Sequence, residues 1–202
     1  TVVKLMDPPA PEAVQAAASS IRFRGMILVY LILKTDQFTE YDAHYFPELS
    51  IPISRMSEPK NYNSATGPKG LTILCGELPC DPGETWWGMS DEEIGRHYVQ
   101  WLNDLGLPVR CEVLRCETRR IAQAYPVYDL DYQRHFETVD GWLSTLDGFL
   151  SFGRQGLFAH DNTHHAFAMA YAAAEVLRAD GTIDRTAWAG HRAEFEHHRV
   201  ED

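Results

Sequence analysis

The chain has 202 residues, of which 45% are hydrophobic and 23% are charged, and these values exclude a disordered or collagen-like protein. Its formal net charge of −11 argues against a nucleic-acid partner, because no basic excess is present to displace the counterions of phosphates. The longest apolar run, Met26 to Leu33, is far shorter than the roughly 18 residues of a membrane helix, so no membrane span is expected.

Local patterns predict the elements in chain order. Pro11 suits the first position of a short helix, and the apolar run 26–34 predicts a strand buried on both faces. Ser90 and Glu93 have the spacing of a capping box, which begins a helix that ends near Gly106. Further strands are expected at 44–46, 51–56, 71–75, 109–121 and 149–152, and further helices at 132–146, 163–178 and 184–198. Sequential strands mixed with helices predict an α+β fold.

The four cysteines form two C-x4-C pairs, Cys75 with Cys80 and Cys111 with Cys116. Residues five apart in a strand face opposite sides of the sheet, so neither pair would converge on a zinc ion. Free thiols in a reducing cytosol are the simpler interpretation, and we therefore expect a cytoplasmic protein.

The segment 149–177 is the most informative part of the chain. Gly153-Arg154-Gln155-Gly156 is followed by a polar loop, His160 to His165, and by a helix rich in alanine. The first turn of such a helix presents free N–H groups that suit an anionic or carbonyl-bearing ligand. The alternative is an ordinary strand-turn-helix with Asp161 or Asn162 as the N-cap.

Histidines are frequent near the C-terminus, but they do not predict a metal site. His160, His164 and His165 lack a carboxylate-rich surrounding in the sequence, which bound metals usually have. His197 and His198 belong to a charged terminal helix and are expected to face solvent. We therefore predict no metal.

Six short segments carry a further signal by their order along the chain: residues 45–48, 54–61, 76–77, 87–93, 124–128 and 153–156. This order resembles the C-terminal half of FAD-dependent, amine-oxidase-like oxidoreductases. That superfamily includes monoamine oxidases, protoporphyrinogen oxidases, phytoene desaturases and, more distantly, UDP-galactopyranose mutases. The bacterial protoporphyrinogen-oxidase-like group has the nearest pattern, and the resemblance extends to about Leu177.

The resemblance implies two domains. Residues 1–147 would form a substrate-binding domain, a mixed β-sheet flanked by helices, and residues 148–202 would form the closing strand-helix segment of an FAD-binding domain with a terminal helix. It also implies cofactor contacts by Gly153, Arg154, Asp161, Asn162, Thr163 and His165.

Three residues are candidates for binding the small-molecule substrate. Arg55 could hold an anionic group by a bidentate pair, or it is an inter-strand arginine. Tyr125 and Tyr128 line the pocket near the flavin, or they pack in a core. No catalytic residue is assigned, because hydride transfer from a substrate carbon to the flavin needs no side-chain acid or base here.

The relatives bind the FAD diphosphate with a G-x-G-x-x-G turn near their N-terminus, and none of the 14 glycines forms this motif. We therefore expect the C-terminal part of a longer flavoenzyme, whose FAD needs a missing N-terminal region. The chain alone is expected to be colourless and inactive. Two alternatives stay open: a non-catalytic interaction domain, and a mutase-like flavoenzyme part in which Arg55 and Arg154 clamp phosphates.

Overall fold

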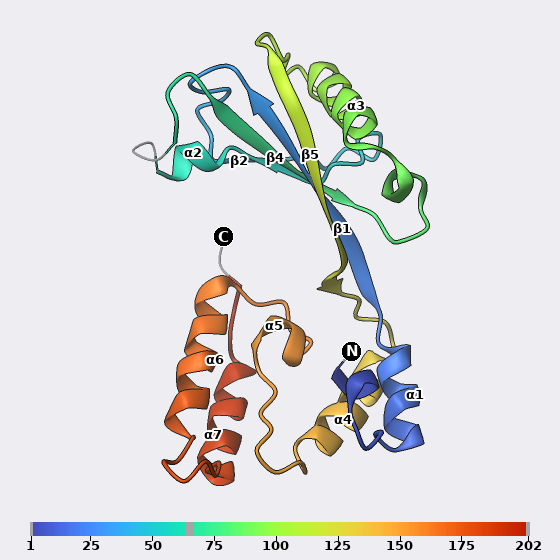
Figure 1. Ribbon diagram of the computed structural model, residues 1–202, viewed down its shortest axis with the longest axis vertical. Helices are drawn as coiled ribbons and strands as arrows, with labels where there is room; N and C mark the ends of the chain where they lie inside the picture. The colour runs from blue at the N-terminus through green and yellow to red at the C-terminus, as the bar shows by residue number, and fades with distance from the viewer. Residues whose placement is uncertain (1, 64–66, 201–202) are drawn as a thin grey trace. The chain divides into compact units, whose positions relative to one another are not determined.

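The computed structural model describes residues 2–63 and 67–200 (Figure 1). The chain divides into two compact units. The sheet unit is Arg24–Ala124, and the helical unit combines Thr1–Phe23 with Tyr125–Asp202. These bounds are set by contacts within the chain. The ranges 1–147 and 148–202 were instead set by the substrate-binding and FAD-binding roles that the resemblance implies, and that assignment stays a prediction.

The sheet unit is built on one five-stranded sheet in the order β2-β3-β4-β1-β5. Pairing is antiparallel between β1 and β4, between β2 and β3, and between β3 and β4. At the two ends of the β1–β5 pair, Lys34 N donates to Glu112 O and Val127 N donates to Arg22 O, so these strands also run in opposite directions. The strands are β1 (Phe23–Leu33), β2 (Ala43–Tyr45), β3 (Arg55–Ser57), β4 (Thr72–Pro79) and β5 (Val113–Pro126).

The sheet is thus antiparallel, and the expectation of a mixed sheet was wrong. Neighbouring strands can return through short connections only when they are antiparallel, whereas parallel neighbours need long crossovers. The α+β class is confirmed: the described residues combine this sheet with seven α-helices.

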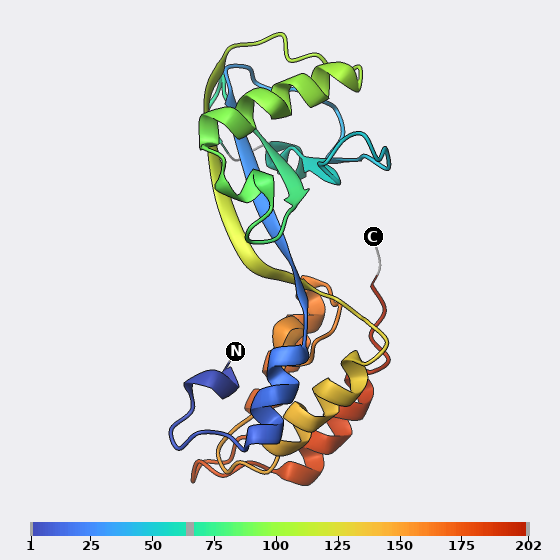
Figure 2. The same ribbon diagram turned by 90° about the vertical axis from the view of Figure 1, so that its right-hand side faces the viewer.

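Helix α3 (Asp91–Asp104) packs on one face of the sheet (Figure 2). The predicted capping box is present, with Ser90 Oγ accepting from Glu93 N and the Glu93 carboxylate accepting from Ser90 N. Ile94, Tyr98 and Leu102 of α3 join the apolar side chains of β1 and β4 in the main core. Short elements complete the unit: α2 (Pro59–Tyr62) and a 3-10 helix, η2 (Thr85–Gly88).

Strand β1 is buried mainly on the face that meets α3. Val29, Leu31 and Leu33 are inaccessible to solvent, while Tyr30 and Ile32, which point to the opposite face, are half-buried. The expectation of burial on both faces was therefore wrong, because an antiparallel sheet can leave one face in contact with water.

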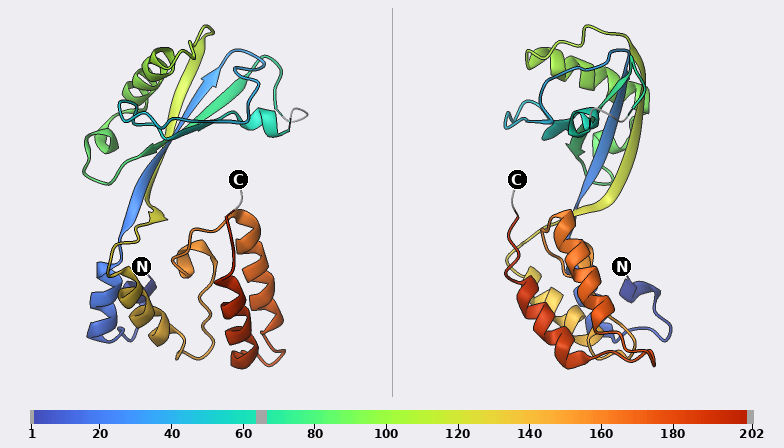
Figure 3. Two further views of the ribbon diagram at one scale, coloured as in Figure 1. Left: turned by 180° about the vertical axis from the view of Figure 1, so that it is seen from behind. Right: turned by 90° about the vertical axis from the view of Figure 1, so that its left-hand side faces the viewer.

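The helical unit contains two packed groups of helices (Figure 3). The first pairs α1 (Glu12–Ser20) with α4 (Tyr132–Leu143), next to η1 (Val2–Leu5). The second packs α6 (Thr163–Glu175) against α5 (Gly153–Gly156) and α7 (Arg185–Phe195). No helix among the described residues is long and apolar enough to cross a membrane.

The strand expected at 149–152 is not formed. Phe152 has extended backbone angles, φ −154° and ψ 175°, but among the described residues that follow β5 the only β-structure is an isolated bridge between Leu177 and Ile183. An extended segment becomes a strand only when a neighbouring strand pairs with it. The three predicted helices exist, with ends up to three residues earlier than expected.

Candidate functional site

The N-terminus of α6 carries most of the predicted cofactor residues. Asn162 is the N-cap, as the alternative interpretation of this loop expected, and its backbone N–H donates to His165 Nδ1 at 3.2 Å. An imidazole nitrogen that accepts a hydrogen bond carries a lone pair and no proton. Thr163, the first residue of α6, is exposed, so its side chain is accessible to a ligand.

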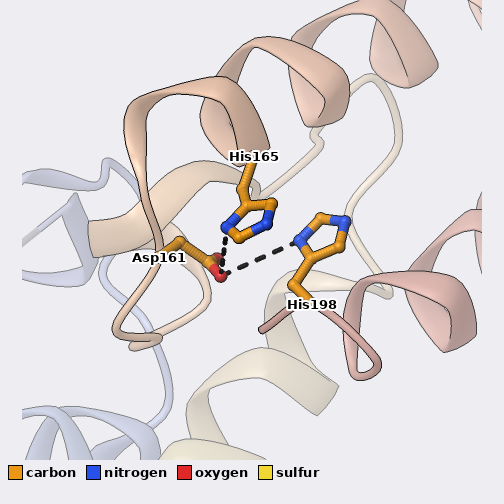
Figure 4. Close-up of side chains that lie close together, drawn as sticks. All are labelled: Asp161, His165 and His198. Carbon is orange, nitrogen blue, oxygen red and sulfur yellow. Dashed lines mark ion pairs between the residues drawn. The ribbon is translucent and has the colours of Figure 1, made fainter. Parts of the chain in front are cut away.

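Asp161, directly before this N-cap, is a buried carboxylate with 7% of its surface exposed. Its Oδ1 lies 3.5 Å from His165 Nδ1 and 3.8 Å from His198 Nδ1, as Figure 4 shows. Among the residues that the structure describes, Asp161 Oδ2 and His198 Nδ1 are both buried without a hydrogen-bond partner. We call these three side chains the Asp161 cluster.

His198 was expected to face solvent, and this was wrong. Helix α7 ends at Phe195, and the chain beyond it places the His198 ring against His165, with ring centroids 4.3 Å apart and an interplanar angle of 12°. His198 also contacts the Phe195 ring. Its side chain is 19% exposed, whereas the neighbouring His197 is exposed, as expected.

Arg154 on α5 is the second unusual side chain of this region. Its guanidinium lies over the Tyr125 ring, 4.5 Å from the centroid, and a cation–π contact of this kind is favourable. Within the described residues, its Nε and Nη2 are nevertheless buried without a hydrogen-bond partner. Buried donors left unpaired are costly, so an acceptor from a ligand would stabilise both groups.

The backbone beside Arg154 leaves room for a ligand. Gly153 has φ +79°, a conformation that favours glycine, and a Cβ added there would meet nothing within 4 Å. Its N–H donates to Met169 Sδ at 3.1 Å. The Tyr125 ring also contacts the exposed His160, with centroids 5.6 Å apart.

The structure thus places all six predicted cofactor residues on α5, on α6 and in the loop between these helices. Tyr125 lies at the end of β5 and contacts Arg154. Tyr128 belongs to the helical unit, but its hydroxyl donates to Phe158 O at 3.1 Å and its ring packs on Tyr132. Burial raises the pKa of Tyr128. This geometry describes a packing residue, and its role in substrate binding stays a prediction.

Arg55 lies in the sheet unit, on β3. Its Nε donates to Glu77 Oε1 at 3.1 Å, Nη2 donates to the same oxygen, and the guanidinium lies over the Tyr45 ring. Burial lowers the pKa of Arg55, but the hydrogen bonds and charges of Glu77 and Tyr45 together outweigh burial, so the pKa is raised overall. The contacts are those of an inter-strand arginine, and an anionic substrate would have to compete with Glu77.

No protein-family model and no curated protein sequence matches the chain, whereas solved structures do. A reduced UDP-galactopyranose mutase superposes on 87% of the chain with a TM-score of 0.65 and 17% sequence identity. The chain has the fold of part of that enzyme. It spans 38% of the mutase chain. A putative protoporphyrinogen oxidase from Exiguobacterium matches 61% of the chain, with a TM-score of 0.49, 13% identity and 28% of its own length covered.

Proposed function

We propose that this chain supplies the substrate-binding domain and the closing segment of the FAD site of a flavin-dependent enzyme. Residues 1–147 would bind the substrate and residues 148–202 would close the cofactor site. Two observations support this: six segments follow the order seen in the flavoenzyme superfamily, and the fold is similar to part of a UDP-galactopyranose mutase.

The observation that carries the cofactor assignment is the unpaired guanidinium of Arg154. Its buried Nε and Nη2 have no partner, it is stacked on Tyr125, and it follows a glycine with open space beside it. A carbonyl or phosphate oxygen of FAD would satisfy both donors with charge-assisted hydrogen bonds. The 13-residue helix α6 adds the positive end of its dipole near Asn162 and Thr163.

The reaction proposed first is hydride transfer from a substrate carbon to the flavin, as in amine-oxidase-like and protoporphyrinogen-oxidase-like enzymes. Bound FAD supplies the electron-accepting chemistry, and the chain's own residues bind and orient both molecules and exclude water. Because the chain contains no G-x-G-x-x-G turn, the FAD diphosphate would be held by a separate N-terminal region. The chain alone would then be inactive.

The second candidate is a mutase-like flavoenzyme, which the likeness to the UDP-galactopyranose mutase favours. Arg154, whose Nε and Nη2 have no partner among the described residues, is suited to clamp a phosphate, whereas Arg55 is already bound to Glu77. Assays separate the two candidates: the oxidoreductase reduces its flavin when a substrate is added, and the mutase converts a sugar nucleotide without net oxidation. The third reading, a non-catalytic interaction domain, requires that no flavin binds at all.

The test joins this chain to its FAD diphosphate-binding region and measures bound flavin by absorbance. Arg154→Ala is expected to weaken FAD binding about tenfold to a hundredfold, because a charge-assisted hydrogen bond contributes about 1.5–3 kcal/mol. The matched control is Arg134→Ala, since Arg134 on α4 is exposed and makes only a long ion pair with Asp131. Equal flavin affinity in both variants removes Arg154 from the cofactor site, and a joined protein without flavin supports the interaction domain.

A further inference from the structure

The Asp161 cluster brings a carboxylate and two imidazole nitrogens together in a buried position. Among the described residues, Asp161 Oδ2 is buried without a hydrogen-bond partner. His165 Nδ1, 3.5 Å from Asp161 Oδ1, already accepts from Asn162 N–H and therefore presents no proton to the carboxylate. His198 Nδ1 is also buried without a hydrogen-bond partner. A carboxylate buried beside two imidazole nitrogens is stabilised by a cation, which is either a bound metal ion or a proton on His198.

We propose that Asp161, His165 and His198 form a binding site for a divalent transition-metal ion. Two imidazole nitrogens and one carboxylate oxygen are a donor set that suits Zn²⁺, Fe²⁺ or Co²⁺ and leaves coordination positions open. Ligand atoms about 2.0–2.2 Å from one ion lie roughly 3–4.5 Å from each other. Here one ligand atom from each residue lies within 4.8 Å of the others.

Metal binding requires one ring to turn. The His165 and His198 rings are nearly parallel, at 12°, so their lone pairs lie in separate planes and do not meet at one point. His198 is the ring that can turn, because it lies beyond the end of α7 and its Nδ1 would lose no hydrogen bond. The ion would replace the long hydrogen bond between Asn162 N–H and His165 Nδ1.

The carboxylate is the essential ligand of this site. The positive end of the α6 dipole repels a cation near Asn162, and the charge of Asp161 must outweigh this repulsion. Its side chain is only 6% exposed, so water screens the attraction weakly. With Asp161 and His165 committed to a metal, Gly153, Arg154, Asn162 and Thr163 remain as flavin contacts, and the metal site does not depend on the proposed flavin function.

The test measures metal binding to the chain alone, without flavin. Co²⁺ is added to the metal-free protein, its visible absorption is recorded, and Zn²⁺ is then used to displace it and to raise the apparent melting temperature. We expect one ion per chain with the spectrum of nitrogen and oxygen ligands. A thiolate charge-transfer band would instead assign the ion to the free cysteines and overturn the proposal.

Variants assign the ligands. Asp161→Asn and His198→Asn are each expected to lower the Co²⁺ affinity about a hundredfold, at the upper end of what supporting groups of metal sites contribute. His197→Asn and His164→Asn are the matched controls, because these neighbours are exposed, and they should keep full affinity. Circular dichroism confirms that each variant is folded.

Two further outcomes overturn the proposal. One is that no ion binds at stoichiometric concentration, or that the two groups of variants bind it equally. The other is an NMR titration in which His198 is protonated and pairs with Asp161 at neutral pH while added Zn²⁺ leaves the ring signals unchanged. In that case a proton on His198, and not a metal, satisfies the buried carboxylate.

Discussion

The two units of the molecule treat a buried carboxylate in opposite ways. In the sheet unit, Glu58 is fully buried, and its carboxylate accepts from Phe38 N and Thr39 N at 2.9 Å and from Thr72 Oγ1 at 2.5 Å. In the helical unit, Asp161 Oδ2 has no partner. A buried charge with a full set of donors organises a fold, whereas one without them points to a ligand.

The largest expected effect on stability comes from removing the hydrogen-bonded carboxylate of Glu58. Glu58→Ala leaves two backbone N–H groups and the Thr72 hydroxyl without their acceptor, and we expect it to lower the free energy of unfolding by about 4 kcal/mol. Urea unfolding followed by tryptophan fluorescence measures this. Glu58→Gln, which keeps one acceptor oxygen, should lose about half as much. A loss below about 1 kcal/mol for the alanine variant would mean that water replaces the carboxylate and that the contrast with Asp161 is weak.

The second prediction concerns the tight packing of the sheet unit. A Cβ at Gly76 would lie 2.7 Å from the ring of Tyr98, which is itself fully buried. Gly76→Ala should therefore destabilise the protein by about 2 kcal/mol through overpacking. In the helical unit, a Cβ at Gly141 in α4 meets nothing within 4 Å, so Gly141→Ala should stabilise that helix by about 0.5–1 kcal/mol. Thermal unfolding measures both variants. If both variants raise the melting temperature, or both lower it, the contrast between the two glycines is contradicted.

A small effect, with the opposite sign to that of Glu58→Ala, is expected at the unsatisfied carboxylate of Asp161. In metal-free protein, Asp161→Asn removes a buried charge that has no donor, and we expect it to raise the free energy of unfolding by about 1 kcal/mol. Asp147→Asn is the control, because Asp147 is exposed and its replacement should change little. If Asp161→Asn destabilises the metal-free chain, Asp161 is a structural residue like Glu58.

Local sequence patterns were sufficient to predict many of the helices and the grouping of the cofactor candidates. The capping box at Ser90 depends on residues three apart, and the structure contains it. The cofactor candidates from Gly153 to His165 are near in sequence, so a strand-turn-helix prediction already placed them on neighbouring elements. The strand expected at 149–152 depended on a partner, and periodicity alone does not supply one.

Contacts between residues far apart in the sequence could not be predicted from local patterns. His198 meets Asp161 because α7 returns along α6, and the sequence around either residue carries no sign of the other. The donors around Glu58 come from the segment after β1 and from β4, which the sequence separates from it by 14 to 20 residues. Which buried carboxylate is satisfied is therefore decided by tertiary structure and not by local pattern.

The sheet unit is an insertion within the chain of the helical unit, since residues on both sides of it build that unit. Helix α1 packs on α4, which is synthesised roughly 110 residues later. At about 5–20 residues per second, a ribosome needs several seconds or more to make the intervening sheet unit. During that time α1 lacks its contacts with α4, so the helical unit is completed only after the inserted sheet unit has emerged and can already fold.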